Sequence, residues 1–441
     1  MLARADAEMS QSIGQVFRMR DLVLSDSPIL RSVPSGKSCG SSPNETCQAG
    51  SCGCASGFIP CTNSCPSGQV CIQPIAIAAG SFHTCALLQG GVVEWWGNNR
   101  VGELGVPIST TPLTSPSPVV VQSSSGTGFL TGVTAISAGG SHTCALLVSG
   151  GIQCWGDNTY GQLGNGAAGS GSATPMNVTS SNGTGTLTGV TAISAVGLNT
   201  CALVNKVVYC WGDNSSGQTG STSTTNVTAP RIVQTAAGAS LTALAVSAGS
   251  TACALINKGG PIQCWGDDAQ GQLGDGSTNS TNVPVNVVSL PAGATSIAAG
   301  AGATYAIVSG GVYSWGDNSD GQLGIGSAIT SAAFPSSITG LSGATMISAS
   351  DQACALTGGT VSCWGFNYYG QVGTAVGTPP YVYTPVVVSG LSGVTAVSAG
   401  GSHTCALQSN GIVQCWGINS DGQLGTGSTL ESNVTPAPVL W

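Results

Sequence analysis

The stretch that decides the fold is Trp155–Gly164, which reads WGDNTYGQLG. Related stretches, called WGDN turns below, begin at seven tryptophans: Trp96, Trp155, Trp211, Trp265, Trp315, Trp364 and Trp416. Shortly before each turn lies a second pattern of the form A-G-x-x-H-T-C-A-L, as at 138–146. Two linked patterns that recur together predict a chain built from copies of one structural unit.

Each repeat contains four strand-like pieces. The first is made of small and β-branched residues, as in Val133–Ala138, and suits the crowded centre of a ring. The H-T-C-A-L and G-I-Q-C-W-G pieces follow, joined by a tight turn such as 149–151. The fourth reads T-P-x-x-V, as at 384–388, and its Pro suits an outer edge strand. The pattern predicts an all-β fold, a seven-bladed β-propeller with four-stranded blades over residues 74–441. Nearly all variation in repeat length is expected between the WGDN turn and the fourth strand.

A different unit precedes the repeats. Residues 37–73 are rich in Gly, Ser, Pro and Asn and contain cysteines at 39, 47, 52, 54, 61, 65 and 71. So short a stretch cannot be stabilised by core burial, which predicts a small disulfide-rich module. Residues 1–36 form an N-terminal extension whose apolar residues either pair with a partner or pack on this module.

Charge and cysteine content restrict the classes of partner and compartment. The formal net charge is -8, and after Lys37 the chain has only four Lys or Arg residues, namely Arg100, Lys206, Arg231 and Lys258. Binding to a phosphate backbone needs many cations, so no nucleic-acid partner is expected. No run of eighteen apolar residues occurs, so no membrane insertion is expected. The 18 cysteines favour an extracellular or cell-surface location, although residues 1–33 lack the apolar core of a signal peptide.

Cysteines on the second and third strands of a repeat predict one disulfide inside each of five blades, because neighbouring antiparallel strands bring such side chains together. Blade five changes both positions at once, to Tyr305 and Ser314, as a disulfide pair would require. The predicted role is to lock the blade. The pairs are Cys144 with Cys154, Cys201 with Cys210, Cys253 with Cys264, Cys354 with Cys363, and Cys405 with Cys415.

Blade one breaks this pairing, because Cys85 faces Trp95 in the repeat pattern. The module before it has an odd number of cysteines, and Cys85 makes that number even. We therefore expect Cys85 or an equivalent to close a bridge between module and propeller. The alternatives are one free thiol or an intermolecular bridge.

The two patterns together resemble the regulator-of-chromosome-condensation repeat family over about residues 74–441. This resemblance implies a seven-bladed propeller. The eukaryotic founder of the family is a nucleotide exchange factor for a small GTPase and binds chromatin. In character the chain more closely resembles secreted bacterial members of the family, one of which uses one face of the ring to bind an enzyme.

The histidines and aspartates of the repeats could each bind a metal ion or play a structural role. His83, His142 and His403 occupy one repeat position in neighbouring blades, so a metal cluster is conceivable. The resemblance instead implies a structural hydrogen bond, because His is common at this position in the family. Asp157 and its equivalents at 213, 267 and 317 could suggest calcium, but each turn supplies too few oxygens, and side chains that cap the turn explain them better. No metal and no cofactor are predicted.

The variable residues inside the WGDN turns are the best candidates for ligand contact. The turn recurs once per blade, so these residues should form a ring on one face. Blade six is richest in tyrosine, which is typical of binding hot spots. The candidates for this binding face are Arg100, Tyr160, Phe366, Tyr368, Tyr369, Tyr381 and Tyr383.

No catalytic constellation stands out from the repeat, so the chain is not expected to be an enzyme. We expect a non-enzymatic extracellular binding protein that holds a protein or glycan on one propeller face. The alternative is a structural subunit of an extracellular filament or surface layer, in which the N-terminal region contacts copies of the same chain. An enzyme that uses the central channel is a third hypothesis.

Overall fold

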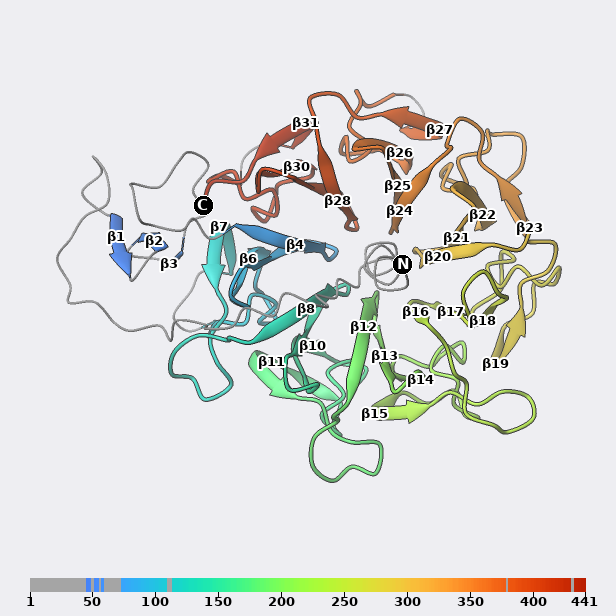
Figure 1. Cartoon of the computed structure of the whole chain (residues 1–441), viewed down its shortest axis with the longest axis horizontal. Coiled ribbons are helices and arrows are strands. Elements are labelled where there is room, and N and C mark those ends of the chain that lie inside the picture. Colours follow the sequence, from blue (N-terminus) through green and yellow to red (C-terminus); the bar gives the residue numbers. More distant parts are fainter. Residues whose placement is uncertain are drawn as a thin grey trace, which may run out of the picture.

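The computed structural model describes residues 73–108, 113–377, 380–429 and 432–441, together with the backbone of 45–48, 51–54 and 57–58. Seven four-stranded antiparallel sheets stand around a central axis, which confirms the predicted propeller (Figure 1). Each blade is a simple meander of four consecutive strands from the axis outward. All four strands come from one repeat, so no strand is exchanged between the first blade and the last.

The strands of the first four blades, from the axis outward, are β4 (Pro74–Ala79), β5 (His83–Leu88), β6 (Val93–Asn98) and β7 (Thr114–Val120); β8 (Val133–Ala138), β9 (His142–Leu147), β10 (Ile152–Asn158) and β11 (Gly169–Asn177); β12 (Val190–Val196), β13 (Asn199–Val204), β14 (Val207–Gly212) and β15 (Val227–Ile232); and β16 (Ala245–Ser247), β17 (Thr251–Leu255), β18 (Ile262–Gly266) and β19 (Thr281–Asn286). Those of blades five to seven are β20 (Ala294–Ala299), β21 (Ala303–Val308), β22 (Gly311–Asp317) and β23 (Ser331–Ser337); β24 (Ala344–Ala349), β25 (Gln352–Thr357), β26 (Thr360–Phe366) and β27 (Tyr381–Val387); and β28 (Val394–Ala399), β29 (His403–Gln408), β30 (Val413–Gly417) and β31 (Asn433–Pro438).

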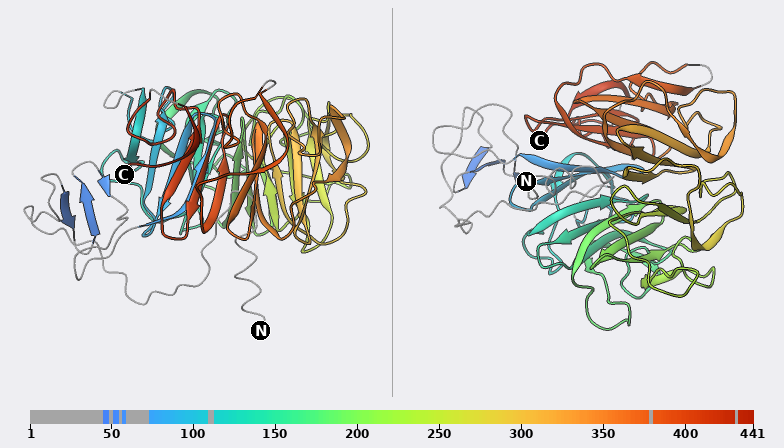
Figure 2. Two further views of the ribbon diagram at one scale, coloured as in Figure 1. Left: turned by 90° about the horizontal axis from the view of Figure 1, so that it is seen from above. Right: turned by 45° about the vertical axis from the view of Figure 1, so that its right-hand side comes forward.

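The meander gives the propeller two different faces, which lie at the upper and lower edges of the ring in the left view of Figure 2. Neighbouring strands are antiparallel, so loops alternate between the two ends of a blade. One face, called the turn face, carries the loops between first and second strands and the WGDN turns between third and fourth strands. The other, called the connector face, carries the tight turns between second and third strands and the links between blades. Every WGDN turn therefore opens on the same face.

The sequence predicted that the repeats differ in length between the WGDN turn and the fourth strand, and this prediction is wrong. The loops between third and fourth strands are similar in length, whereas the connectors differ. Those after the first three blades, at 121–132, 178–189 and 233–244, are about twice as long as those at 287–293, 338–343 and 388–393. The long connectors double back on themselves through bridges such as Gln122 to Phe129 and Thr179 to Thr186. They are self-contained hairpin excursions on the connector face, so they leave the ring geometry unchanged.

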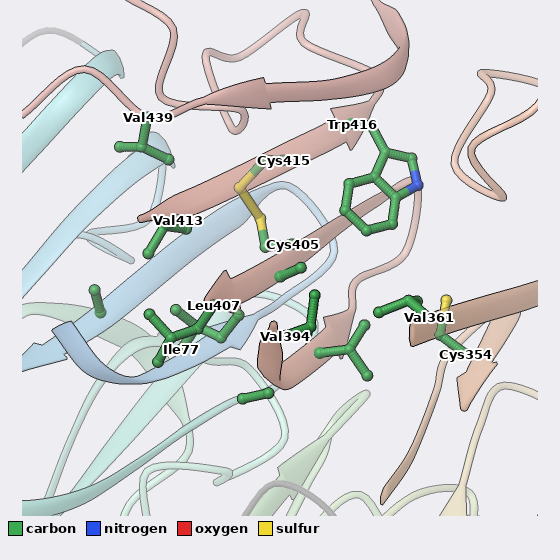
Figure 3. Close-up of a cluster of buried hydrophobic side chains, with 14 of the residues drawn as sticks. Ile77, Cys354, Val361, Val394, Cys405, Leu407, Val413, Cys415, Trp416 and Val439 are labelled. Atoms are coloured by element: carbon green, nitrogen blue, oxygen red, sulfur yellow. A yellow bond between two sulfur atoms is a disulfide. The ribbon is translucent and has the colours of Figure 1, made fainter. Parts of the chain in front are cut away.

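The core lies between blades and not inside one sheet. Innermost strands are almost fully buried, whereas outer strands such as β7 are half-exposed. Figure 3 shows one cluster, in which Trp416 and Val413 of blade seven pack with Val361 of blade six and Ile77 of blade one. Burial of side chains contributed by adjacent blades supplies the main stabilisation of a propeller.

Serine side chains bind free amides along the innermost strands. The hydroxyl of Ser194 accepts from the amide of Ala248 in the next blade at 3.0 Å, and Ser247 accepts from Ala299 at 2.9 Å. An innermost strand is an edge strand whose amides would otherwise face the neighbouring blade without a partner. The innermost strands were predicted from their small residues, and the serines among these residues also join one blade to the next.

The N-terminal part contains a three-stranded antiparallel sheet, formed by β1 (Glu45–Gln48), β2 (Ser51–Cys54) and β3 (Gly57–Phe58). The predicted disulfides of the module and the extension at 1–36 lie outside the described residues. Within the described part of the chain, no helix has the length and apolar character needed to span a membrane.

Candidate functional site

The WGDN turns are rigid because their polar side chains bind one another. In blade two, Asp157 accepts the amide of Thr159 at 3.0 Å and the side-chain amide of Gln162 at 2.8 Å. Asn158 accepts the amide of Leu163 at 3.1 Å. Equivalent bonds occur around Asp213, Asp267 and Asp317. The turn-capping interpretation is confirmed, because the turn itself uses the oxygens that a calcium site would require.

Each turn is also fixed to the next blade by a tryptophan. The indole of Trp211 donates to the carbonyl oxygen of Gln162 at 2.9 Å, and Trp265 donates to Gln218 at 3.0 Å. All seven WGDN tryptophans make this contact to the preceding blade, with Glu103 in place of Gln for Trp155. The predicted packing of these indoles between blades is thus accompanied by a hydrogen bond. It places the variable residues of the turns at fixed positions on the turn face.

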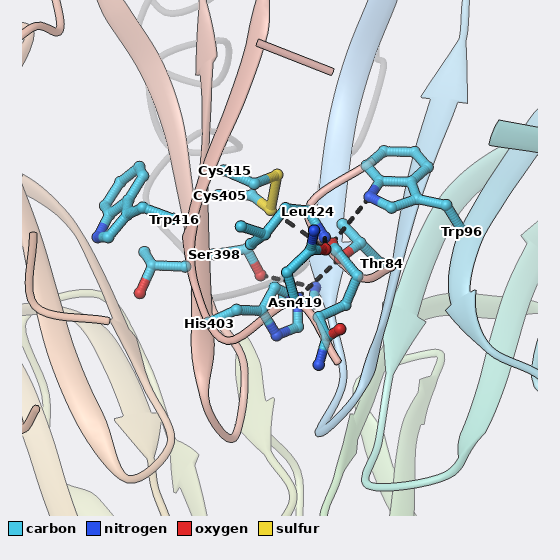
Figure 4. Close-up of a disulfide and its surroundings, with 12 residues drawn as sticks. Thr84, Trp96, Ser398, His403, Cys405, Cys415, Trp416, Asn419 and Leu424 are labelled. Carbon is cyan, nitrogen blue, oxygen red and sulfur yellow. Dashed lines mark hydrogen bonds between the residues drawn. A yellow bond between two sulfur atoms is a disulfide. The ribbon is translucent and has the colours of Figure 1, made fainter. Parts of the chain in front are cut away.

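The ring closes between blade seven and blade one by the same contacts. The indole of Trp96 donates to the carbonyl of Gln423 at 2.9 Å. Thr84 donates to the same carbonyl at 2.8 Å and lies 2.7 Å from the ring nitrogen Nε2 of His403 (Figure 4). Ser398 accepts the amide of Ala79 at 2.9 Å. Side-chain hydrogen bonds and packing therefore close the ring, and no blade combines strands from the two ends of the propeller.

The three histidines bind the threonine of the following blade. Nε2 of His142 lies 2.9 Å from the hydroxyl of Thr200, and His83 is 3.4 Å from Thr143. Burial lowers the pKa of His142 to about 4, and burial lowers those of His83 and His403 to about 3. The histidines are therefore neutral at physiological pH and make the structural hydrogen bond that the resemblance implied. Among the described residues, no three His, Cys, Asp or Glu side chains gather in a way that could hold a metal ion.

The structure contains five disulfides in the propeller, which join the same pairs that the repeat predicts. They link Cys144 to Cys154, Cys201 to Cys210, Cys253 to Cys264, Cys354 to Cys363 and Cys405 to Cys415. In each pair the two residues are directly opposite on the second and third strands. Each disulfide therefore fixes the register of two strands inside one blade.

The predicted bridge from Cys85 to the module is wrong. Cys85 is a free, fully buried thiol opposite Trp95. The indole of Trp95 fills the space that a partner cysteine occupies in other blades, and it packs edge-on against Trp155. Cys85 therefore has no route to a cysteine outside the core. Burial also raises the pKa of its thiol, so the free-thiol alternative is the one that the structure has.

Five of the candidate binding residues gather into one aromatic cluster on blade six. Phe366 stacks on Tyr368 with a centroid distance of 6.3 Å and lies 6.2 Å from Tyr381. Tyr369 and Tyr383 extend the cluster through edge-on contacts with these tyrosines. Tyr368 is 59% exposed. The sequence grouped these residues correctly because they flank one turn and its neighbouring strand.

The remaining two candidates lie on other blades. Arg100 of blade one is largely exposed and forms a salt bridge of 3.5 Å with Asp421 of blade seven. Tyr160 lies on blade two, half-buried. They share the turn face with the aromatic cluster but are not part of it.

Two aspartates outside the seven binding-face candidates border the aromatic cluster, one of them a variable residue of a WGDN turn. Asp320, in the WGDN turn of blade five, lies beside Tyr381, and its negative charge raises the pKa of the Tyr381 hydroxyl. Asp351, in the first loop of blade six, has its carbonyl oxygen 3.4 Å from the amide of Phe366. Burial raises the pKa of Asp351 to about 6, and the charge of Asp320 adds to the effect. No sequence signal connects the two aspartates, because they come from different blades.

A pocket opens on the turn face at the axis of the ring. Its volume is about 260 Å³, and most of its lining comes from the glycines and alanines of the first loops. Ser81, Asn199, Asp213 and Asp351 supply polar groups. Asp351 therefore lines the axial pocket and is also joined through its backbone to Phe366 of the aromatic cluster.

Comparisons with known proteins agree with this fold. The regulator of chromosome condensation (RCC1) repeat matches residues 95–146, 149–203, 207–256, 262–307, 309–356 and 358–407, and a second form of the repeat matches 75–103, 133–162, 294–322 and 394–423. The ultraviolet-B receptor UVR8 of Arabidopsis thaliana is 31% identical over 369 residues, covering 81% of this chain and 80% of the receptor. The human E3 ubiquitin-protein ligase HERC2 is 31% identical over 220 residues, which are 50% of this chain and only 4% of the ligase.

Solved structures show the same architecture. Yeast RCC1 (Prp20), in its crystal structure with Kap60, superimposes with a TM-score of 0.67 at 20% identity, covering 84% of this chain and 85% of that one. Human WBSCR16 gives a TM-score of 0.66 at 22% identity, covering 79% of this chain and 95% of that one. Because the repeat matches successive blades of the propeller, the chain belongs to the family of regulator of chromosome condensation (RCC1) repeat proteins.

Proposed function

We propose that this chain is a non-enzymatic extracellular binding protein that holds a protein ligand on the turn face. The observation that carries the proposal is the aromatic cluster of blade six, a partly exposed patch with Tyr368 as its most exposed residue, on a rigid ring. Tyrosine side chains offer a large contact area with little loss of conformational entropy, which makes them effective anchors in interfaces. The turns that carry them are already ordered, so binding loses little flexibility.

The disulfides support the extracellular part of the proposal. Five cystines in one propeller are characteristic of oxidising compartments and are rare where thiols are kept reduced. Related propellers also meet other proteins: yeast RCC1 is bound to Kap60 in one solved structure. The non-enzymatic part is supported by the histidines, since each side chain is buried and directed at a threonine of the next blade.

The alternative role, a subunit of a filament or surface layer, depends on residues 1–36, which lie outside the described residues. The outer strands of the propeller offer it little support. Pro116 and Pro118 in β7, Pro335 in β23 and Pro385 in β27 interrupt the exposed edges at which another strand would pair. No observation on the described part of the chain favours assembly over ligand binding.

Site-specific photocrosslinking tests the proposal. A photoreactive phenylalanine analogue is placed at Ser420 on the turn face or at Val148, which is 79% exposed on the connector face. We expect a discrete crosslinked partner from native surroundings at Ser420 and none at Val148. Tyr368→Ala together with Tyr369→Ala should abolish the Ser420 product. Equal crosslinking from both faces, or a Ser420 product unaffected by the double substitution, would contradict the proposal.

A further inference from the structure

The acidic residues of the propeller are concentrated on the turn face. With the exception of the buried Glu94 in β6, every described Asp and Glu of the propeller lies in a loop of the turn face or at a strand end that enters one. They are Glu103, Asp157, Asp213, Asp267, Asp268, Asp275, Asp317, Asp320, Asp351 and Asp421. Among the described residues of these loops, Arg100 is the one Lys or Arg, and it pairs with Asp421.

The connector face has the opposite character. Lys206 and Lys258 lie in its tight turns, and no described acidic residue lies in its loops. The negative charge of the propeller is therefore directed to one side. A surface that carries many charges of one sign attracts ligands of the opposite sign and speeds their association.

Acidic and aromatic groups meet where blade five contacts blade six. Asp320 lies beside Tyr381 and raises the pKa of its hydroxyl. The ring centroid of Tyr381 is 6.2 Å from those of Phe366 and Tyr383. Asp351, whose pKa the charge of Asp320 helps to raise, lines the axial pocket. Burial raises the pKa of Asp320, and the charge of Asp317 adds to this effect. These carboxylates are crowded by one another, and no described Lys or Arg lies in the loops that surround them. A cation bound here would relieve that repulsion.

We propose that this acidic and aromatic surface of blades five and six, together with the adjoining mouth of the axial pocket, binds an arginine-containing segment of a partner protein. The proposal rests on the proposed function and assigns a chemistry to the same face. A guanidinium group stacks on tyrosine rings and bonds to carboxylates through paired donors, so it matches both components of the surface. An ammonium group matches the carboxylates but stacks less well.

The propeller of a second copy is a poor occupant of this surface. The propeller has Arg100, Lys206, Arg231 and Lys258 as its Lys and Arg residues, and they are spread over blades one, three and four. No two of them form the basic segment that the surface requires. The cations that bind here must therefore come from outside the propeller.

Peptide binding to the full-length protein tests the chemistry. The probe is a fluorescent nine-residue peptide with arginine alternating with serine, and the control peptide replaces each arginine by uncharged, isosteric citrulline. By fluorescence anisotropy we expect the arginine peptide to bind and the citrulline peptide not to. Asp351→Asn should weaken binding about fivefold, which corresponds to the loss of one partly buried ion pair. Tyr368→Ala should weaken binding by a similar factor through lost stacking.

Asp275→Asn is the matched control, because it removes one carboxylate from the turn face in blade four, away from the aromatic cluster. Equal weakening by Asp275→Asn and Asp351→Asn would overturn the proposal in favour of diffuse attraction by the whole face. Equal binding of the two peptides, or none of either, would also overturn it. Thermal unfolding of each variant verifies that the propeller is intact.

A further variant separates the partner from the chain's own N-terminal extension, which carries Arg4, Arg18, Arg20 and Arg31. If replacing these four arginines with glutamine strengthens peptide binding, the extension already occupies the surface and the assignment to a partner is wrong. Unchanged affinity supports the assignment. A further outcome separates the two proposals. If a partner still crosslinks at Ser420 but Asp351→Asn does not change its binding, the proposed binding face stands and only the proposed arginine chemistry is refuted.

Discussion

Tyr305 and Ser314 stand directly opposite each other in blade five, at the positions where five other blades have a disulfide. Both side chains bond to the WGDN turn of their own blade. The Tyr305 hydroxyl donates to the carbonyl of Gln322 at 2.6 Å, and Ser314 donates to the carbonyl of Leu323 at 2.7 Å. Blade five therefore replaces a covalent link between two strands with two hydrogen bonds from those strands to the turn.

We predict that Tyr305→Cys combined with Ser314→Cys forms a sixth disulfide in the propeller. The register of β21 and β22 matches that of the disulfide-bearing strand pairs, so the two thiols should meet without a change in the backbone. Mass spectrometry of the unreduced, alkylated protein should show the two new cysteines linked. Alkylation of both residues would contradict the prediction, and either single variant serves as a control with one additional free thiol.

The close approach of Gly164 to Trp211 leads to a prediction about blade docking. A Cβ at Gly164 would lie 2.6 Å from the indole nitrogen of Trp211, and the glycine has a φ of +65°. Gly166 has a similar φ of +87°, but its nearest neighbour would be 4.0 Å away. Gly166→Ala should therefore lower the free energy of unfolding by about 1 kcal/mol through backbone strain alone.

Gly164→Ala should lower the free energy of unfolding by at least about 3 kcal/mol, because the indole must also move away from the carbonyl of Gln162. Urea unfolding, monitored by tryptophan fluorescence, measures both values. Equal destabilisation by the two substitutions would show that contact with the next blade does not limit this position.

The parts of the molecule that were predictable are those determined within one repeat. The strand order, the Cys144 to Cys154 type of pair and the aromatic cluster around Tyr368 all involve residues close in sequence, so the repeat pattern identifies them. Asp351 and its proximity to Asp320 were missed because the two residues meet only when two blades stack. The prediction for Cys85 failed for a different reason. An even number of cysteines says nothing about access. Cys85 is fully buried, and Trp95 occupies the position opposite it where other blades have the partner cysteine.

The buried histidines predict a loss of stability in acid. His142 has a pKa of about 4 in the fold, below the unfolded value of 6.5, so the unfolded chain binds more protons between these values. The contribution of neutral His142 is therefore complete above about pH 6.5 and is lost as the pH falls toward the folded pKa. Gln352 occupies the equivalent position in blade six and donates to Thr404 at 3.0 Å, which makes glutamine a natural replacement.

We expect His142→Gln to reduce the acid-induced loss of unfolding free energy between pH 7.5 and pH 5 by about 2 kcal/mol. Denaturant unfolding at the two pH values measures the difference, and carboxylates such as Asp351 contribute equally to both proteins. Equal losses in the variant and the parent would mean that His142 takes up its proton in the folded state over the same pH range as in the unfolded chain.

Cys85 should be inert in the folded protein despite being a free thiol. It is fully buried beneath Trp95, and burial raises its pKa, so neither access nor thiolate character favours reaction. Treatment of the native protein with a maleimide should leave the peptide that contains Cys85 unmodified, whereas the same treatment in denaturant should modify it completely. Trp95→Ala opens a cavity next to the thiol, and the native protein should then react at a measurable rate. Rapid labelling of the native parent protein would show that blade one opens readily, and labelling in neither state would show that Cys85 is bonded after all.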